Sequence, residues 1–446
     1  MKKYLSIFLM PLALSLATAC DDGYEPIMEE VDVRLDSTIA TYYDELASAE
    51  NGWLANIPTS KGIYRFWMQF TDDNRVTMYT DNLMYPEYRR TGKQSTFRIQ
   101  GLQRPTLIFD TYSYLAIIND PDPTISGGSA DDNQGLETDF EFEIASFDGT
   151  TFELLGRRNR VKATLTMATA AEAAAVEQGA LMGVQETLQE YMAHEGYDYI
   201  ELDGEKIAVN FGLHKISLQY VRGSNRVVTV SSDSYVDLDG NIVLSEPLVV
   251  KGTIISSFLW SAATKSYSAM SVQRLPVRIQ SEAIIGLSAM LGGDKGFTYH
   301  SMAFRTTMYN GNISCEIAQL LTKMSRNLSS TSTAWSLGDI YFRFGQEKGK
   351  DYIDVEISFG IYLATYTFDI LENPNQTTRF TGYDTRHDAV GNADYLLENN
   401  CTNDFFDYFV GKTFRKTWLD QMFGTYKMGA LVDVADSENY LPGALL

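Results

Sequence analysis

Alternation of apolar and polar residues with a period of two constrains the fold of this chain most strongly. In residues 140–144 two glutamates alternate with three apolar residues, and Asp148-Gly149 follows. Successive side chains of a β-strand point to opposite faces of the sheet, and Asp-Gly is a preferred hairpin turn. The pattern therefore predicts antiparallel strands joined by tight turns, with one face of the sheet buried.

The same alternation recurs along most of the chain. In a first block it predicts one antiparallel sheet that curls toward a barrel or sandwich, with strands at 63–70, 75–79, 97–99, 106–109, 140–144, 151–155 and 161–167. A second block at about 199–277 has hairpins marked by Asp203-Gly204 and Asp239-Gly240. Further strands are expected at 340–344 and 352–370.

Helices are expected between these strands. Apolar residues at helical spacing, with cap residues at the ends, predict helices at 36–50, 169–192, 281–291, 314–327 and 403–423. The expected fold class is α+β, predominantly antiparallel β, with barrel- or sandwich-like sheets and interspersed helices. Its regions are a signal peptide (1–19), a tether (20–35), a helix plus β domain (36–168), a helical connector (169–198), a second β-rich region (199–300) and a C-terminal α+β region (301–446).

The first twenty residues predict the cellular location of the protein. Lys2 and Lys3 precede an uncharged apolar core at 4–16, and small residues then lead to Cys20. This is the layout of a secretory signal, and its core is too short to span a bilayer. Small residues that end on cysteine resemble the lipobox of bacterial lipoproteins, which implies acylation of Cys20 and an anchor in the outer membrane. The alternative is ordinary cleavage near Ala19 that leaves Cys20 a free thiol.

Acidic residues follow the cysteine directly. Asp21 and Asp22 resemble a surface-export signal of Bacteroidota lipoproteins, although an Asp there also resembles an inner-membrane retention signal, and the pair also suits a plain solvated tether. Removing residues 1–19 takes two lysines from the 36 basic residues and none of the 58 acidic ones, so the mature charge is −24. A charge of this sign argues against nucleic acid as a partner.

Several short motifs resemble one protein family. They are Asn51-Gly52-Trp53, residues 105–112 (PTLIFDTY), Asn119-Asp120-Pro121, a Gly-Gly loop, residues 139–142 (DFEF) and residues 154–157 (LLGR). Together they resemble an uncharacterised Bacteroidota lipoprotein family, over about residues 36–170. The resemblance implies a place beside a SusC/SusD-type outer-membrane importer and a zinc metallohydrolase lipoprotein. It implies no catalytic residue.

The loop between the strands at 106–109 and 140–144 is the first candidate site. Carboxylates and glycines in a long loop could gather oxygen ligands around Ca²⁺, and the candidates are Asp120, Asp122, Asp131, Asp132 and Asp139. Their spacing matches no EF-hand, and a solvated loop or a ligand-contact loop are the alternatives.

Catalytic motifs are absent from the sequence. His194-Glu195 starts a zincin pattern, but Asp198 stands where the second histidine belongs. Among the tryptophans, Trp67 is a candidate ligand contact because it lies on the strand face that also carries Arg65 and Gln69. Cys315 and Cys401 could form a disulfide in an oxidising compartment, although sequence cannot bring them together.

These observations favour a surface-exposed outer-membrane lipoprotein that is a non-enzymatic accessory or ligand-binding component of a TonB-dependent nutrient importer. The alternatives are a glycan or peptide hydrolase that uses an unidentified carboxylate pair, and a structural protein that assembles with its own copies. No cofactor is expected other than calcium at the loop described above.

Overall fold

The computed structural model describes residues 31–82, 84, 90–128, 135–223, 226–293, 296–305, 315–373 and 376–446. The signal peptide, Cys20, Asp21 and Asp22 lie outside these residues. The chain divides into two compact units, Met1–Glu186 and Thr187–Leu446. The expected class is confirmed, because the described chain is mostly antiparallel β with barrel-like sheets and helices between them.

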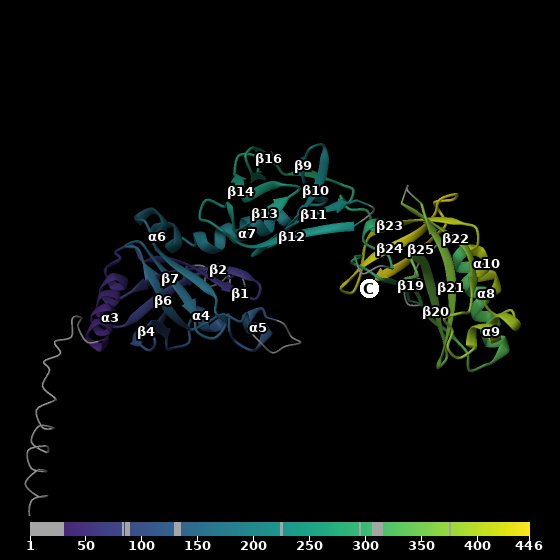
Figure 1. Ribbon diagram of the computed structural model, residues 1–446, viewed down its shortest axis with the longest axis horizontal. Coiled ribbons are helices and arrows are strands. Elements are labelled where there is room, and N and C mark those ends of the chain that lie inside the picture. The colour runs from purple at the N-terminus through teal and green to yellow at the C-terminus, as the bar shows by residue number, and fades with distance from the viewer. Residues whose placement is uncertain are drawn as a thin grey trace, which may run out of the picture. The chain divides into compact units, whose positions relative to one another are not determined.

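The first unit is a closed antiparallel barrel preceded by helix α3 (Val31–Ser48) (Figure 1). Its strands follow one another in chain order: β1 (Trp53–Thr59), β2 (Gly62–Phe70), β3 (Arg75–Thr80), β4 (Lys93–Gly101), β5 (Pro105–Phe109), β6 (Glu141–Phe147), β7 (Thr151–Gly156) and β8 (Lys162–Met167). The barrel closes where β1 pairs with β8, from Trp53 opposite Met167 to Asn56 opposite Thr164. The sequence predicts one sheet that curls toward a barrel or a sandwich, and the structure has the barrel.

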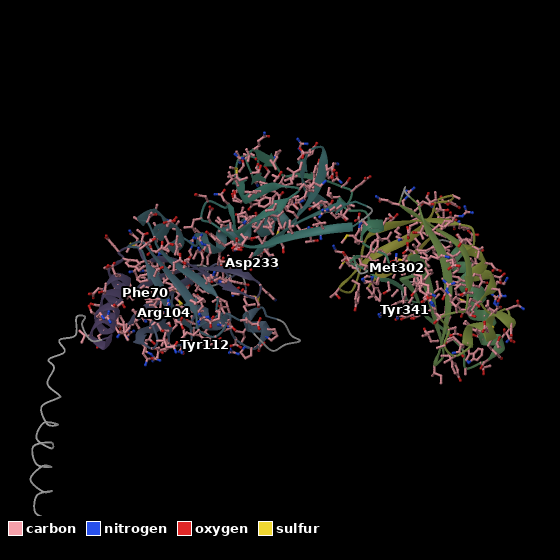
Figure 2. The ribbon with its side chains drawn as sticks, viewed as in Figure 1. Phe70, Arg104, Tyr112, Asp233, Met302 and Tyr341 are labelled. Atoms are coloured by element: carbon pink, nitrogen blue, oxygen red, sulfur yellow. The ribbon has the colours of Figure 1, made fainter. Side chains whose placement is uncertain are left out.

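Helix α3 packs against the barrel by one aromatic stripe. The ring of Tyr42 contacts Phe152 edge-on at 5.5 Å between centroids, and the Tyr43 hydroxyl accepts a hydrogen bond of 2.7 Å from the Ile99 amide. The helix begins at Val31 rather than at Asp36, so the last residues of the expected tether are helical. Figure 2 marks Phe70, which is buried in this barrel, and Tyr112, which is exposed on it.

The Asn51-Gly52-Trp53 motif is the junction between α3 and β1. The Trp53 indole donates to the Leu46 carbonyl (3.0 Å), and the Trp67 indole donates to the Asn51 carbonyl (2.9 Å). Gly52 has a φ of +69°, and a Cβ added there would lie 2.8 Å from the Met68 carbonyl oxygen. Only glycine fits this turn, because the conformation is left-handed and the neighbouring atom is backbone.

Replacing Gly52 with alanine should therefore destabilise the first unit by about 2 kcal/mol. The matched control is Gly149→Ala, at a φ of +97° with no atom within 4 Å of the added Cβ. Urea unfolding should show a larger loss for Gly52→Ala than for the control. Equal losses would mean that backbone strain alone, and not the close approach to Met68, requires glycine at position 52.

Short helices interrupt the barrel between β5 and β6. They are α4 (Tyr114–Ile117) and α5 (Pro123–Ser126). After β8 come α6 (Ala170–Glu177) and α7 (Ala180–Met192), where a helix was expected at 169–192. Residues 169–172 (TAAE) match the pattern of a capping box, and the box is present: the Thr169 hydroxyl accepts from the Glu172 amide, and the Glu172 carboxylate accepts from the Thr169 amide.

The second unit contains a nine-stranded antiparallel sheet and a second closed barrel. The sheet has the order β16-β15-β14-β13-β12-β11-β10-β9-β17, with β9 (Tyr197–Leu202), β10 (Glu205–Phe211), β11 (Lys215–Arg222), β12 (Arg226–Val236), β13 (Ile242–Val250), β14 (Thr253–Ser261), β15 (Ser266–Met270), β16 (Arg274–Pro276) and β17 (Arg278–Gln280).

The second barrel again follows chain order. Its strands are β18 (Ser301–Phe304), β19 (Leu337–Glu347), β20 (Lys350–Phe359), β21 (Tyr362–Glu372), β22 (Thr377–Asp384), β23 (Thr413–Phe423), β24 (Tyr426–Asp433) and β25 (Tyr440–Leu445). In chain order, helix α8 (Cys315–Thr331) comes between β18 and β19, and helices α9 (Asn392–Glu398) and α10 (Asn403–Phe409) come between β22 and β23; Figure 1 labels the three helices. Apolar side chains of all three helices join the barrel core.

Two expected helices are wrong. Residues 281–291 contain only one turn of 3₁₀-helix, η2 (Leu287–Ala289). The helix expected over 403–423 ends at Phe409, and β23 pairs with β24 instead, because the left-handed Gly411 (φ +78°) breaks the helix and Phe414 and Trp418 also fit a period of two. No helix in the described part of the chain is long and apolar enough to cross a membrane.

Candidate functional site

The second unit contains a cavity of about 530 Å³. Side chains from the end of α7, from β9, β10 and β11, from residues 283–290 and from β23 and β24 line it. Its apolar wall includes Met192, Val209, Phe211, Ile285, Met290, Trp418 and Met422. Its polar wall consists of His194, Tyr197, Asp198, Asn210, Gln219, Asp420 and Lys427. A mostly apolar cavity with a few polar groups is the usual form of a small-molecule site.

Hydrogen bonds hold the wall elements together. The Trp418 indole on β23 donates to the Ile285 carbonyl at 2.9 Å. Where α7 turns into β9, Gly196 has a φ of +106°, and a Cβ there would lie 2.7 Å from the Gln280 carbonyl oxygen. This glycine lets the chain reverse, so that Asp198 comes back beside Tyr191 and His194.

Tyr191, His194 and Asp198 form a hydrogen-bonding cluster at the cavity. The Tyr191 hydroxyl donates to Asp198 Oδ1 at 2.7 Å, and His194 Nε2 lies 3.5 Å from Asp198 Oδ2. His194 Nδ1 lies 2.5 Å from the Tyr191 carbonyl oxygen, which can only accept, so Nδ1 carries a proton. His194 Nε2 is buried and has no hydrogen-bond partner among the described residues.

Aromatic rings surround this cluster and lower its exposure to water. The rings of Phe211, Trp260 and Tyr267 each pack against Tyr191 at 5.0–6.0 Å between centroids. Burial raises the pKa of Asp198, although the Tyr191 hydroxyl and His194 act in the opposite direction. Burial, and next the hydrogen bond to Asp198, raises the pKa of Tyr191. The two atoms of the cluster that are left for a ligand, His194 Nε2 and Asp198 Oδ2, can both accept a hydrogen bond.

Replacing Asp198 with asparagine should make unfolding less dependent on pH. Because the pKa of Asp198 is raised on folding, this carboxyl contributes stability below its unfolded value of about 4, and that contribution is lost as the pH rises through the folded-state pKa. Asparagine cannot ionise but can still accept from Tyr191. The free energy of unfolding in urea should increase from the wild type to the variant by more at pH 7 than at pH 3. An equal increase at both pH values would contradict the raised pKa of Asp198.

Sequence reasoning named two members of this cluster only as a failed zinc motif. The spacing of His194 and Asp198 is i,i+4, but their contact depends on a turn after α7 and not on a helix. No group of three or more metal-binding side chains occurs among the described residues. Tyr191 and the β23 residues of the cavity were missed, because Tyr191 was assigned to a helix stripe and β23 to a helix.

In the candidate calcium loop, the described carboxylates accept hydrogen bonds from the protein itself. Asp120 accepts from the Tyr112 hydroxyl and the Asp122 amide (3.0 and 2.9 Å). Asp122 caps α5, and hydrogen bonds from Thr124 lower the pKa of Asp122. Asp139 is buried and accepts from the backbone amides of residues 158 and 159. Asp131 and Asp132 lie outside the described residues.

Trp67 and the cysteines are also placed. Trp67 is only 6% exposed and packs edge-on against Tyr79, so its ring is part of the protein interior and not an open platform. Cys401 is a free, buried thiol beside Thr331 at the end of α8. Cys315 begins the same helix, about 24 Å from Thr331 at a rise of 1.5 Å per residue, so it lies too far from Cys401 for the disulfide that the sequence left possible.

Solved structures give only weak likenesses. The transferrin binding protein B of Neisseria meningitidis matches at 9% identity over 86% of this chain with a TM-score of 0.13, and the match spans 62% of that chain. The DNA polymerase β subunit of Streptococcus pyogenes matches at 9% identity over 91% of this chain and 98% of that one, with a TM-score of 0.11. These scores carry no argument about fold or function. No curated protein matches the sequence.

A family model does match, over residues 28–262. This range is more than half of the 446 residues, and it extends well beyond the motifs at 36–170 that carry the resemblance. It covers the first barrel, α6, α7 and the sheet strands up to β14. The chain therefore belongs to the family described as Domain of unknown function (DUF4302).

Proposed function

We propose that this protein is a surface-exposed outer-membrane lipoprotein of the Bacteroidota that binds a small ligand, without turnover, for a TonB-dependent importer of the SusC/SusD type. The anchor rests on Cys20 after its apolar core and on the acidic pair Asp21-Asp22. The observation that carries the binding role is the cavity of about 530 Å³, which the half-buried side chains of His194 and Asp198 line, with Tyr191 hydrogen-bonded to Asp198 beside it.

The walls of the cavity define the chemistry of the ligand. The apolar wall, which includes Phe211, Met290 and Trp418, favours an apolar body. The imidazole Nε2 of His194 and the carboxylate of Asp198 favour a head group that donates hydrogen bonds. A ligand of this kind would give His194 Nε2 the partner that it lacks.

Affinity purification from the native outer membrane tests the accessory role. A tagged, acylated protein extracted in mild detergent should bring a SusC/SusD-type pair in stable proportion, with a metallohydrolase lipoprotein as a further expected partner. A Cys20→Ser variant should leave the membrane fraction and lose these partners. Recovery of the acylated protein alone would contradict the accessory role. Retention of the Cys20→Ser variant in the membrane fraction would contradict the acyl anchor at Cys20.

One observation favours a hydrolase as the second candidate. Asp198 and Asp420 line the same cavity, and the pKa of Asp198 is raised by burial. Two carboxyl groups in one cavity, one of them with its pKa raised by burial, could act as acid and base on a glycan or peptide. Turnover of such a substrate by the pure protein, abolished by both Asp198→Asn and Asp420→Asn with the fold intact, would establish this function and overturn the non-enzymatic one.

A further inference from the structure

We propose that the first barrel carries a second binding site, for a neutral polyhydroxylated ligand such as a sugar unit. A cavity of about 550 Å³ lies where the β5–β6 crossover meets the turn between β7 and β8. Residues from both segments line it, including Asn119, Glu137, Thr138, Phe140, Glu141 and Arg158. Every residue on which the proposal depends belongs to the first unit.

Hydrogen bonds of polar side chains, among them the buried Asp139, fix the walls of this cavity. Asp139 accepts from the Arg158 and Asn159 amides at 2.8 and 2.9 Å. The side chain of Asn159 donates to the Thr138 carbonyl (2.8 Å), and Asn119 Oδ1 accepts from the Thr138 amide (2.9 Å). A Cβ at Gly156 would lie 1.9 Å from Asp139 Oδ2, so glycine is needed there. These contacts tie the crossover to the turn, which means that the site is already formed before any ligand arrives.

The charges of the wall favour a neutral ligand. Three carboxylates (Glu137, Asp139 and Glu141) stand against two guanidiniums (Arg157 and Arg158), so there is no excess of positive charge for an anion. Arg157 and Glu141 are paired at 2.7 Å. Neighbouring hydroxyls can donate to a carboxylate and accept from a guanidinium at once, which suits an array of both groups.

A flat apolar surface and two unpartnered groups complete the match. Phe140 is 40% exposed, and its ring can cover the C–H face of a sugar. Thr138 is only 4% exposed, yet its hydroxyl has no partner among the described residues, and neither has Asn119 Nδ2. Both residues line the cavity, and a buried polar group without a partner is a cost that a bound hydroxyl would offset.

The test is binding of the full mature chain to an array of neutral oligosaccharides, followed by calorimetry on each hit. Phe140→Ala and Arg158→Gln should each weaken binding by about tenfold or more. The matched control is Arg104→Gln, an exposed arginine in the β4–β5 turn of the same barrel, marked in Figure 2, which should leave affinity unchanged. Thr138→Val should lower affinity without lowering the melting temperature, whereas a structural hydroxyl would lower both.

Several results would overturn the site. The first is the absence of binding to any neutral glycan on the array. The second is an affinity of the Phe140 and Arg158 variants equal to that of the wild type. The third is binding of free amino acids in place of glycans. The proposal is independent of the cavity in the second unit. Ala208→Phe, which narrows that cavity, should leave glycan binding unchanged, and a loss there would place the glycan in the second unit instead.

Discussion

Replacing Glu372 with leucine should destabilise the second unit by about 2–4 kcal/mol. The residue pairs with Lys416 on β23, whose side chain is only 2% exposed. Lys416 Nζ donates to Glu372 Oε1 at 2.8 Å and to the Leu291 carbonyl at 3.0 Å, and it lies 4.8 Å from the centre of the Phe344 ring. Without Glu372, the buried ammonium group of Lys416 would keep only uncharged partners, the Leu291 carbonyl and the Phe344 ring. The expected loss is below the roughly 3–5 kcal/mol of a fully buried pair, because the Glu372 side chain is 34% exposed.

The reverse variant sharpens this prediction. Lys416→Met should cost much less, because Glu372 remains partly in water and still accepts from the Thr378 hydroxyl at 2.9 Å. The loss is measured by guanidinium unfolding of the mature protein, followed by near-ultraviolet circular dichroism. Equal losses in the two variants would contradict the asymmetry of burial on which the prediction depends.

Replacing Trp53 with alanine should destabilise the first unit by about 3–5 kcal/mol. Trp53 is fully buried at the start of β1, where its ring packs against Phe152 at 5.2 Å and Phe147 at 6.3 Å between centroids. The variant removes this volume from the barrel core and also leaves the Leu46 carbonyl at the end of α3 without its indole donor.

The matched control for Trp53 is Tyr112→Ala, an exposed aromatic residue of the same unit. Its loss of stability should stay below about 0.5 kcal/mol. Unfolding followed by tryptophan fluorescence and unfolding followed by circular dichroism should both show a larger loss of stability for Trp53→Ala than for Tyr112→Ala. Comparable stability in both variants would show that the Trp53 side chain does not anchor the core of the first barrel.

Local patterns in the sequence predicted much of the secondary structure. Period-two runs located β2 to β8 of the first barrel but not β1, and the Thr169/Glu172 pair predicted the start of α6, because strand alternation and helix capping act over a few residues. Closure of β1 onto β8 depends on pairing between residues more than a hundred positions apart, such as Trp53 and Met167. Local sequence therefore left barrel and sandwich equally open.

The candidate site was less predictable. Phe414 and Trp418 fit both a helical and a strand spacing, and their segment forms strand β23 because it pairs with β24. The contact of Tyr191 with Asp198 depends on the left-handed turn at Gly196, and no short sequence pattern predicts that turn. In the loop after β5, the described carboxylates serve as caps and turn acceptors, a use that the same residue types allow as readily as metal binding.

Native mass spectrometry of the acylated protein, purified from its own outer membrane, tests the binding role most directly. We expect a small molecule that remains with the wild type and leaves on denaturation. It should be absent from Ala208→Phe, which narrows the cavity of the second unit, and present in the control Ala263→Phe, at an exposed turn between β14 and β15. A wild type without a bound molecule, or equal retention by Ala208→Phe, would contradict a ligand-binding function for this cavity.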